Sequence, residues 1–259
     1  MTEHTKDDRY LVPALEQASR VLFCLARADS THTSLNDVCE SVGIHKSRAF
    51  AILHTLNKFG FVQRNTEGMG YSLGPGLVSL SRRFLDKLSA PRLAEPILAE
   101  LARKTGNTAV FGLIAEKYVF VVAKHEGEQA VSITMRLGQR FPLSYGSHGK
   151  AIAARLPEKE LDLLLREEKL YFHGEPSKFD RDRLGREMEA CRREGFVLEV
   201  GEMVQGLSTV AVAVTGVSGT PIGYIVLIGL FSVETARDLG PFVAGAGRAL
   251  SQQLGAGKE

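Results

Sequence analysis

The spacing of apolar residues changes near Gly106, and that change limits the folds open to this 259-residue chain. Before Gly106, apolar residues recur with the period of amphipathic helices. After it, short apolar or alternating runs bounded by turn residues predict strands, with helical segments between them. The pattern predicts a helical N-terminal part, followed by an α+β part with one mainly antiparallel sheet.

Residues 10–60 predict three helices, and a hairpin follows them. Ser34 and Asp37 resemble a capping box that starts the second helix, and Gly43 marks the turn to the third. Phe61–Arg64 and Gly70–Leu73 read as the two strands of the hairpin. The apolar faces of the three helices are Leu15, Ala18, Val21, Leu22 and Leu25; Leu35, Val38, Cys39 and Val42; and Ala49, Ile52, Leu53, Leu56 and Phe59.

A connecting helix begins at Gly76, and Pro91 separates it from the next helix. The organisation predicted is a winged helix-turn-helix domain over 1–75, a linker helix over 76–90, and an α+β domain over 91–257. The strands expected in the last domain are Ala109–Ile114, Tyr118–Ala123, Val131–Met135, Phe196–Val200, Thr209–Val214 and Ile222–Ile228, with helices near 147–155, 157–167, 180–194 and 234–253.

Composition excludes several classes of protein. The three cysteines are scattered, which argues against a disulfide scaffold or a CxxC metal site. The charged N-terminus lacks the apolar core of a signal peptide, and the longest apolar run is too short to span a bilayer. These features predict a soluble, cytoplasmic protein with no membrane partner. A net charge of +2 says nothing about nucleic acid, so any such signal must be local.

The third predicted helix, about His45 to Phe59, carries that local signal. Between Ser41 and Thr66 there are four Lys or Arg, two His and no acidic residue. A solvated amphipathic helix would also show a charged face. However, the outward side chains include short ones and an aromatic, Phe50, and the order of elements is that of a winged helix-turn-helix. We expect this helix to bind double-stranded DNA. The residues on the outward face are Ser47, Ala51, His54 and Lys58, flanked by Arg48 and Phe50.

Over almost its whole length the sequence resembles the IclR-type family of bacterial transcriptional regulators. The matching segments, taken in order, are specific only as a set. They are Val12–Ala18 with Arg20, Gly43–Ser47, Gly70–Gly74, Gly138–Leu143, Gly149–Ala151, Gly195–Phe196 and Gly206–Leu207. Ala51 and Arg48 depart from the residues common in the family, Arg and Thr respectively, so a different operator sequence is expected.

The resemblance implies a GAF-like effector-binding domain with a small-molecule cleft, and a dimer that can pair into a tetramer. It implies no cofactor. Carried over position by position, the cleft lining is Phe141, Ser147, His148, Glu199, Thr209, Val226 and Ile228. Structural roles are also open for these residues, because Val226 and Ile228 suit a plain core strand, Ser147 suits a helix cap, and His148 suits solvent.

Motifs that would indicate an enzyme are incomplete. Gly149-Lys150 lacks the first glycine and the Ser/Thr of a phosphate loop, and Gly206–Val210 lacks the second glycine of a nucleophile elbow. His125, His148 and His173 have no metal-ligand spacing. On one strand, Glu199 and Glu202 would face opposite sides. No catalytic residues are predicted.

The sequence therefore predicts a ligand-responsive regulator, a repressor or an activator, of a catabolic operon. Its DNA contacts would be Lys46, Ser47, Arg48, Phe50 and His54 in the major groove, with Arg20 and Arg64 on phosphates. The operator would be pseudo-palindromic, matching a two-fold dimer. Val226 and Ile228 replace two pocket serines of the family's small-acid sensors, which favours an apolar, aromatic carboxylate as effector. The rival interpretation is an α+β enzyme with an N-terminal partner-binding module.

Overall fold

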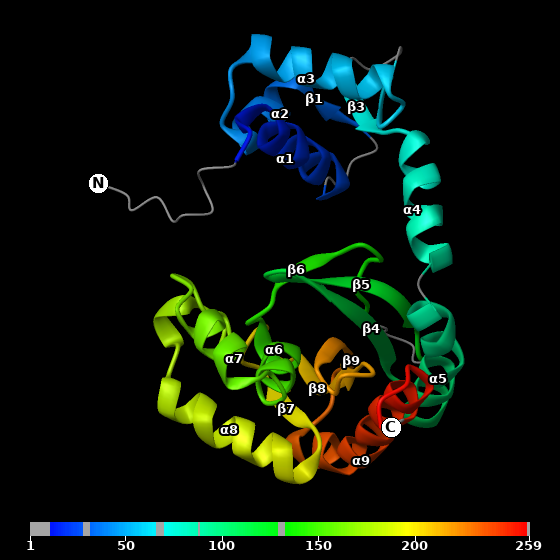
Figure 1. Cartoon of the computed structure of the whole chain (residues 1–259), viewed down its shortest axis with the longest axis vertical. Coiled ribbons are helices and arrows are strands. Elements are labelled where there is room, and N and C mark those ends of the chain that lie inside the picture. The colour runs from blue at the N-terminus through cyan, green and yellow to red at the C-terminus, as the bar shows by residue number, and fades with distance from the viewer. Residues whose placement is uncertain (1–10, 28–31, 66–69, 88, 129–132, 258–259) are drawn as a thin grey trace. The chain divides into compact units, whose positions relative to one another are not determined.

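The computed structural model describes residues 11–27, 32–65, 70–87, 89–128 and 133–257 (Figure 1). The chain divides into two compact units, Met1–Lys87 and Leu88–Glu259. Each unit has a hydrophobic core of its own, as a separately folding domain requires.

The N-terminal unit is a winged helix-turn-helix, as the sequence predicts. Its first three helices share one core, and in its small antiparallel sheet β3 lies between β1 and β2. Strand β1 was not predicted, because two residues are too few to show alternation. The elements are α1 (Pro13–Arg27), β1 (Thr33–Ser34), α2 (Leu35–Val42), α3 (Lys46–Lys58), β2 (Val62–Arg64), β3 (Gly70–Leu73) and α4 (Gly76–Lys87).

Local sequence signals fix where α2 begins and ends. The Asp37 N–H donates to the Ser34 hydroxyl at 3.2 Å, and the Ser34 N–H donates to the Asp37 carboxylate at 3.1 Å. This reciprocal pair is the predicted capping box. Gly43 ends the helix with φ of 73°, a left-handed conformation that a side chain would strain. These signals hold α3 one tight turn after α2.

The predicted apolar faces of the three helices meet in the core, with two exceptions. Leu15 is 67% exposed, because the first turn of α1 precedes the buried part of that helix. Phe59 is 65% exposed, because α3 ends at Lys58 and the helical spacing does not continue. The buried residues of this core are Val21, Leu25, Val38, Ala49, Ile52, Leu53, Leu56, Val62 and Tyr71.

The C-terminal unit is an α+β domain. Its described residues form one sheet with the strand order β6-β5-β4-β9-β8-β7, and all neighbouring strands are antiparallel. The elements are α5 (Ser89–Thr105), β4 (Thr108–Ala115), β5 (Tyr118–His125), β6 (Arg140–Pro142), α6 (Gly146–Ala153), α7 (Glu158–Leu165), the short 3-10 helix η2 (Pro176–Lys178), α8 (Arg181–Glu194), β7 (Val197–Val200), β8 (Ser208–Thr215), β9 (Pro221–Gly229) and α9 (Val233–Gln253).

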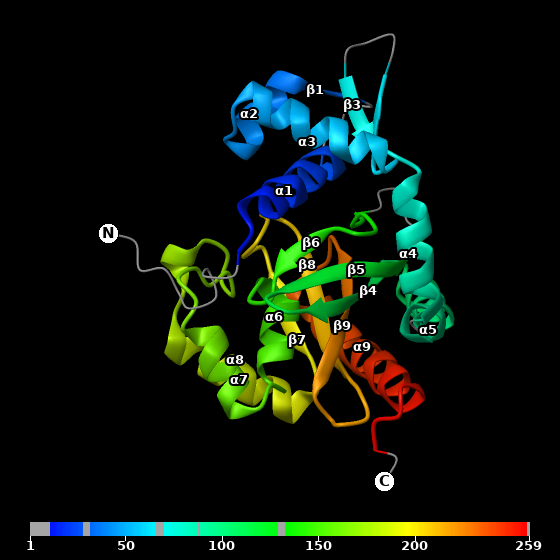
Figure 2. The same ribbon diagram turned by 45° about the horizontal axis from the view of Figure 1, so that its top comes forward.

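Helices cover both faces of this sheet. In Figures 1 and 2, α5 and α9 lie on one face, and α6, α7 and α8 lie on the other. Two apolar clusters correspond to these two layers. Alternate residues of β4, β8 and β9 belong to opposite clusters; Val226 and Leu227 are one such pair. The strands are buried on both sides, which explains their nearly continuous apolar runs.

Three predicted details of this unit differ from the structure. The expected strand Val131–Met135 lies partly outside the described residues, and residues 133–135 are not in a strand. The edge strand β6 was not predicted, because Arg140–Pro142 is short and contains a proline. The predicted division into two helices is present, but the boundary precedes Pro91: α5 starts at Ser89 and has Pro91 in its first turn, where a missing N–H costs nothing.

Candidate functional site

The outward face of α3 gathers the residues predicted to bind DNA. Lys46, Ser47, Phe50 and His54 are all exposed on one helix, and the buried residues of α3 are confined to its other side. No acidic side chain occurs in 41–65, so the potential of this face is positive. A positively charged helix with short side chains can enter the major groove. The other predicted contact residues, Arg20, Arg48, Ala51, Lys58 and Arg64, are also exposed.

Two of these arginines have partners within the unit. Arg48 Nε donates to Gln17 Oε1 at 2.9 Å, which ties the start of α3 to α1. Arg20 forms an ion pair with Glu16 on the surface of α1. The Arg48 guanidinium keeps its terminal nitrogens for another partner, but its direction is set by Gln17. Because Glu16 partly neutralises Arg20, a phosphate contact by Arg20 would be weaker than the sequence alone leads us to expect.

Phe50 is the aromatic side chain on this face. It is 48% exposed, and its ring stacks on that of His54 with centroids 6.3 Å apart. The stack makes one flat surface from an apolar ring and a ring with polar edges. Such a surface suits contact with thymine methyl groups and neighbouring base edges.

In the C-terminal unit, the seven residues predicted to line a cleft meet at one cavity of about 180 Å³. Strand register explains part of this convergence: Glu199 pairs with Thr209, and Thr209 pairs with Ile228, so the three lie in a row across β7, β8 and β9. Val226 lies two residues from Ile228 on the same face. Phe141, Ser147 and His148 come from β6 and the start of α6.

The cavity has further lining residues that sequence reasoning missed. Tyr145 and Gly146 belong to the start of α6, next to residues that were predicted. The others come from irregular segments, which carry no periodic signal. The additional lining residues are Ile133, Thr134, Met135, Gln139, Tyr145, Gly146, Met203, Val204 and Leu207.

A directed chain of hydrogen bonds forms one polar edge of the cavity. Thr209 Oγ1 donates to Glu199 Oε2 at 3.1 Å, and Ser147 Oγ lies 2.7 Å from Thr209 Oγ1. Because a hydroxyl has a single proton, Thr209 can only accept from Ser147, and Ser147 must donate. Ser147 therefore presents acceptor lone pairs to the cavity.

The second oxygen of Glu199 fixes the segment that follows β7. Glu199 Oε1 accepts from the N–H groups of Glu202 at 2.7 Å and Met203 at 3.1 Å. The prediction that Glu199 and Glu202 share one strand is wrong, because β7 ends at Val200 and Glu202 lies beyond it. Met203 and Val204 are thereby held over the cavity.

Lys150, considered above as part of a phosphate loop, is instead a buried structural cation. Its side chain has no exposed surface, and Nζ lies 3.0 Å from Glu187 and 3.2 Å from Glu202. Burial favours the neutral form of Glu187, but Lys150, His173 and Arg183 outweigh it and lower the pKa of that carboxyl. Arg183 also pairs with Glu202. Lys150 thus joins α6 and α8 to the segment that carries Met203.

His148 is buried among aromatic rings. Its ring stacks on Tyr224 with centroids 4.4 Å apart and also contacts Phe141 and Tyr145. Burial lowers the pKa of His148 to about 3, so the ring is neutral near pH 7. Its Nε2 has no hydrogen-bond partner among the residues described. A solvent-exposed position for His148, which the sequence leaves open, is excluded by its burial.

The start of α6 is buried and uncapped. Tyr145, the N-cap residue, makes no side-chain cap, and Gly146 N–H donates to Tyr171 O at 3.1 Å. Within the described ranges, the N–H groups of Ser147 and His148 have no partner, although both residues are nearly fully buried. A buried helix end with free N–H groups is a site for an anion or another acceptor.

Two further features, a metal-binding group and a membrane-spanning helix, are not found among the described residues. They contain no group of three or more His, Cys, Asp or Glu side chains that could hold a metal ion. None of the helices in these ranges is long and apolar enough to cross a bilayer.

Comparison with known proteins places both units. Residues 14–66 match the IclR helix-turn-helix domain, and residues 83–251 match the bacterial transcriptional regulator IclR C-terminal domain. The regulator XynR of Escherichia coli is 29% identical over 248 residues, which cover 95% of this chain and 98% of that protein.

Solved structures share the fold. A regulator from Alicyclobacillus acidocaldarius has a TM-score of 0.80 and 26% identity, covering 94% of this chain and 99% of its own. A homologue from Microbacterium hydrocarbonoxydans, crystallised with 4-hydroxybenzoate, has a TM-score of 0.75 and 19% identity, covering 93% and 98%.

Proposed function

Because the chain belongs to the IclR family of bacterial transcriptional regulators, we propose that it controls a catabolic operon in response to a small aromatic carboxylate. It is a regulator and not an enzyme, since both matching domains are those of regulators. The observation that carries the effector proposal is the uncapped, buried start of α6 at the wall of a largely apolar cavity. In this proposal, residues 1–75 bind DNA, residues 76–90 form the linker helix, and residues 91–257 bind the effector. The protein acts in the cytoplasm, where operon DNA is found.

The DNA contact is made by α3 in the major groove, with Lys46, Ser47, Phe50 and His54 towards the bases. Arg48 is held by Gln17, so its terminal nitrogens meet one base position at a fixed angle. Arg64 on β2 contacts a phosphate. Lys58 and Ala51 complete this face, and Arg20 has a lesser part because of Glu16.

The operator is pseudo-palindromic, because a two-fold dimer presents two α3 helices related by the same symmetry. Footprinting on DNA fragments selected by the protein should show two protected half-sites of related sequence, contacted by a dimer or by dimers paired into a tetramer. One asymmetric half-site protected by a monomer would contradict this.

The walls of the cavity favour an apolar ligand. Val226, Ile228, Phe141, Met135 and Met203 supply aliphatic, thioether and aromatic surface. Apolar ligand surface removed from water contributes about 25 cal/mol per Å². A small keto acid would leave several oxygens facing this wall without partners, at about 1–3 kcal/mol each.

The acid group of the ligand binds at the start of α6. The free N–H groups of Ser147 and His148 point along the helix axis, and His148 Nε2 offers another nitrogen. No lining residue of this cavity is Lys or Arg, so the backbone must neutralise the acid. The positive end of the helix dipole adds to that effect.

The cavity also offers hydrogen-bond acceptors, which a hydroxyl group on the aromatic ring of the ligand can satisfy. Glu199 Oε1 is filled by two N–H donors, whereas Oε2 has only Thr209 and can accept one more bond. Ser147 also offers lone pairs. A ligand hydroxyl could donate to either, which keeps the acid group away from the Glu199 carboxylate. The Microbacterium homologue guides only the choice of test compound, because 19% identity supports similarity of fold alone.

Calorimetric titration of the full chain tests this proposal. We expect 4-hydroxybenzoate to bind more tightly than benzoate or phenol, and glyoxylate and pyruvate to bind more weakly than all three. The substitution Val226→Ser should weaken binding of the aromatic acids selectively. Tighter binding of glyoxylate or pyruvate than of any aromatic acid would refute the effector class. Phenol binding as tightly as 4-hydroxybenzoate would refute the acid site at α6.

A further inference from the structure

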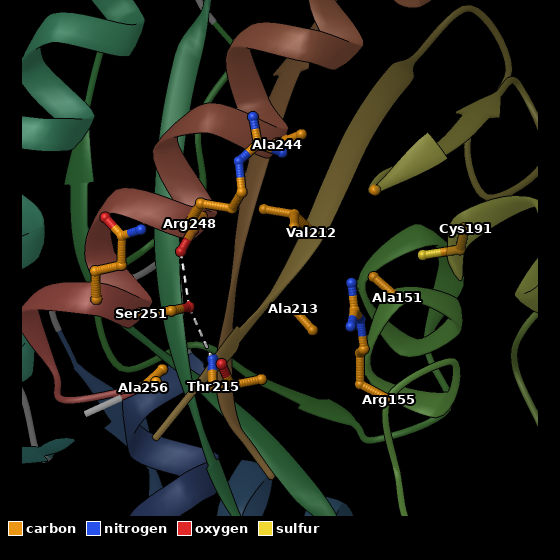
Figure 3. A pocket seen from close by; sticks show the side chains of 14 residues that line it. Ala151, Arg155, Cys191, Val212, Ala213, Thr215, Ala244, Arg248, Ser251 and Ala256 are labelled. Carbon is orange, nitrogen blue, oxygen red and sulfur yellow. Dashed lines mark hydrogen bonds between the residues drawn. The ribbon is translucent and has the colours of Figure 1, made fainter. Parts of the chain in front are cut away.

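The C-terminal unit contains a second cavity, of about 320 Å³, which shares no lining residue with the first. It lies between α6, the end of α8, strand β8 and α9, and Figure 3 shows it from close by. Ser251 secures one wall, because its hydroxyl accepts from Thr215 N–H at 3.0 Å and donates to Gly247 O at 2.7 Å. Neither the effector proposal nor the DNA contact uses this cavity.

Two arginines give the cavity a positive charge. Arg155 and Arg248 line it, and no lining residue is acidic. Figure 3 shows their side chains on opposite sides, with Val212 and Ala213 between them. Within the part of the chain that the structure describes, neither guanidinium group has an ion-pair or hydrogen-bond partner. Both guanidinium groups are therefore available to an anion in the cavity.

The sheet adds backbone groups to this cavity. Strand β7 begins at Val197, which pairs with Ala211, so β8 continues past its neighbour. Successive residues of a strand direct their N–H and C=O groups to alternate sides. Gly201 N–H donates to Leu207 O at 2.8 Å, so Leu207 and alternate residues after it direct their backbone groups to the β7 side. Ala213 is one of these residues, and it lies where β7 has already ended. Ala213 thus offers an N–H donor between the two arginines.

Small and apolar groups supply much of the lining, and Val212 and Ala213 lie between the two arginines (Figure 3). Ala151, Ala213, Ala244 and Gly247 contribute small groups, and Val212 contributes an isopropyl group. A ligand with one charged end at each arginine and a hydrocarbon centre would match this distribution. We propose that this cavity is a second ligand site, which binds a small aliphatic dicarboxylate between Arg155 and Arg248.

A structural role for the arginines is the competing explanation. A Cβ added at Gly195 would lie 3.8 Å from Arg248 Nη1, so that guanidinium is beside the end of α8. Arg155 lies near Cys191, which belongs to α8. Burial raises the pKa of the Cys191 thiol, and the charge of Arg155 acts in the opposite direction. Cations near a helix C-terminus stabilise it. In that case, removing either arginine would lower stability and leave ligand binding unchanged.

Calorimetry of the full chain with succinate, glutarate and adipate tests the proposal, with butyrate and inorganic phosphate as comparison ligands. We expect one dicarboxylate to bind more tightly than butyrate and phosphate. Arg155→Gln and Arg248→Gln should each weaken it about tenfold or more, since each removes a charge-assisted contact. Arg166→Gln, a change at an exposed arginine outside the cavity, should leave the affinity unchanged.

A competition experiment distinguishes binding at the two cavities. Saturating 4-hydroxybenzoate should not displace the dicarboxylate, and Val226→Ser should not alter its affinity. Failure of the aromatic acid to bind would count against the effector proposal alone. Failure of every dicarboxylate to bind, tighter binding of phosphate, or equal affinity in the arginine variants would each overturn the second site. Thermal unfolding of the variants identifies the structural role if stability falls while binding persists.

Discussion

The Ser147 hydroxyl oxygen lies 2.7 Å from that of Thr209, and both hydroxyls are buried in the wall of the cavity of about 180 Å³. Thr209 in turn donates to Glu199, whose other oxygen holds two backbone N–H groups. The serine, threonine and glutamate thus act as one unit, which aligns α6 with β7 and β8.

Replacing Thr209 by valine should therefore destabilise the fold. Thr209→Val keeps the shape but leaves Glu199 Oε2 without its donor and Ser147 without its acceptor. We expect the free energy of unfolding in urea to fall by about 1–3 kcal/mol. Thr209→Ser keeps the hydroxyl and loses a methyl group, so it should cost less. Equal losses in the two variants would show that packing, and not the hydrogen bonds, is responsible.

Replacing the buried Lys150 should destabilise the fold more strongly. Lys150→Met keeps the length of the side chain but removes the fully buried cation from Glu187 and Glu202, which keep only the more exposed Arg183. Breaking such a pair from one side costs about 3–5 kcal/mol. The double variant Lys150→Met, Glu187→Gln should be more stable than the sum of the single changes predicts, as measured by a denaturant double-mutant cycle. Strict additivity would mean that the two side chains are not coupled.

His148 predicts a pH dependence of stability. Its pKa is about 3 in the folded protein, and an unfolded histidine titrates near 6.5. Below pH 6.5 the unfolded chain takes up a proton that the folded chain does not. The stability from the neutral ring is thus complete above pH 6.5 and is lost as the pH falls. The slope approaches about 1.4 kcal/mol per pH unit. Urea unfolding between pH 7 and 5 should show a shallower slope for His148→Gln, and identical slopes would contradict the burial of the ring.

On DNA, Arg48→Ala and Arg64→Ala should have different consequences. Loss of Arg48 should cost about 1–3 kcal/mol and relax preference at one operator position, whereas loss of Arg64 should weaken all sequences alike and reduce the salt dependence. Gln17→Ala should reproduce part of the Arg48 effect, because it frees the guanidinium without removing it. Titrations of a set of operator variants measure both quantities. An Arg48→Ala protein with unchanged affinity and preference would exclude base reading by this residue.

Regular elements could be predicted from the sequence because their signals are local. The capping box of Ser34 and Asp37 and the apolar run Thr209–Val214, predicted to be a strand, depend only on neighbours in the chain, and both are confirmed. Phe59 was placed in the core by helical spacing that stops one residue before it. Residues 133–135 were expected to be a strand, but a short apolar run does not decide between strand and irregular structure.

The lining of the cavity could be predicted from the sequence only in part. Its seven predicted residues came from the family resemblance, and the strand register explains why Glu199, Thr209 and Ile228 meet. Met203 and Leu207 line it from an irregular segment with no period to detect. The role of Lys150 could not be foreseen, because its partners Glu187 and Glu202 are distant in sequence and its burial depends on the complete fold.

Central to the proposed function is that occupation of the Ser147–Glu199 cavity changes DNA binding. The most direct test is the affinity of the full chain for its selected operator, measured with and without saturating 4-hydroxybenzoate, in the wild type and in a Val226→Phe variant whose cavity is filled. We predict that the ligand changes the wild-type dissociation constant by about fivefold or more and leaves that of the variant unchanged. An unchanged constant in the wild type, or an equal change in the variant, would contradict the claim.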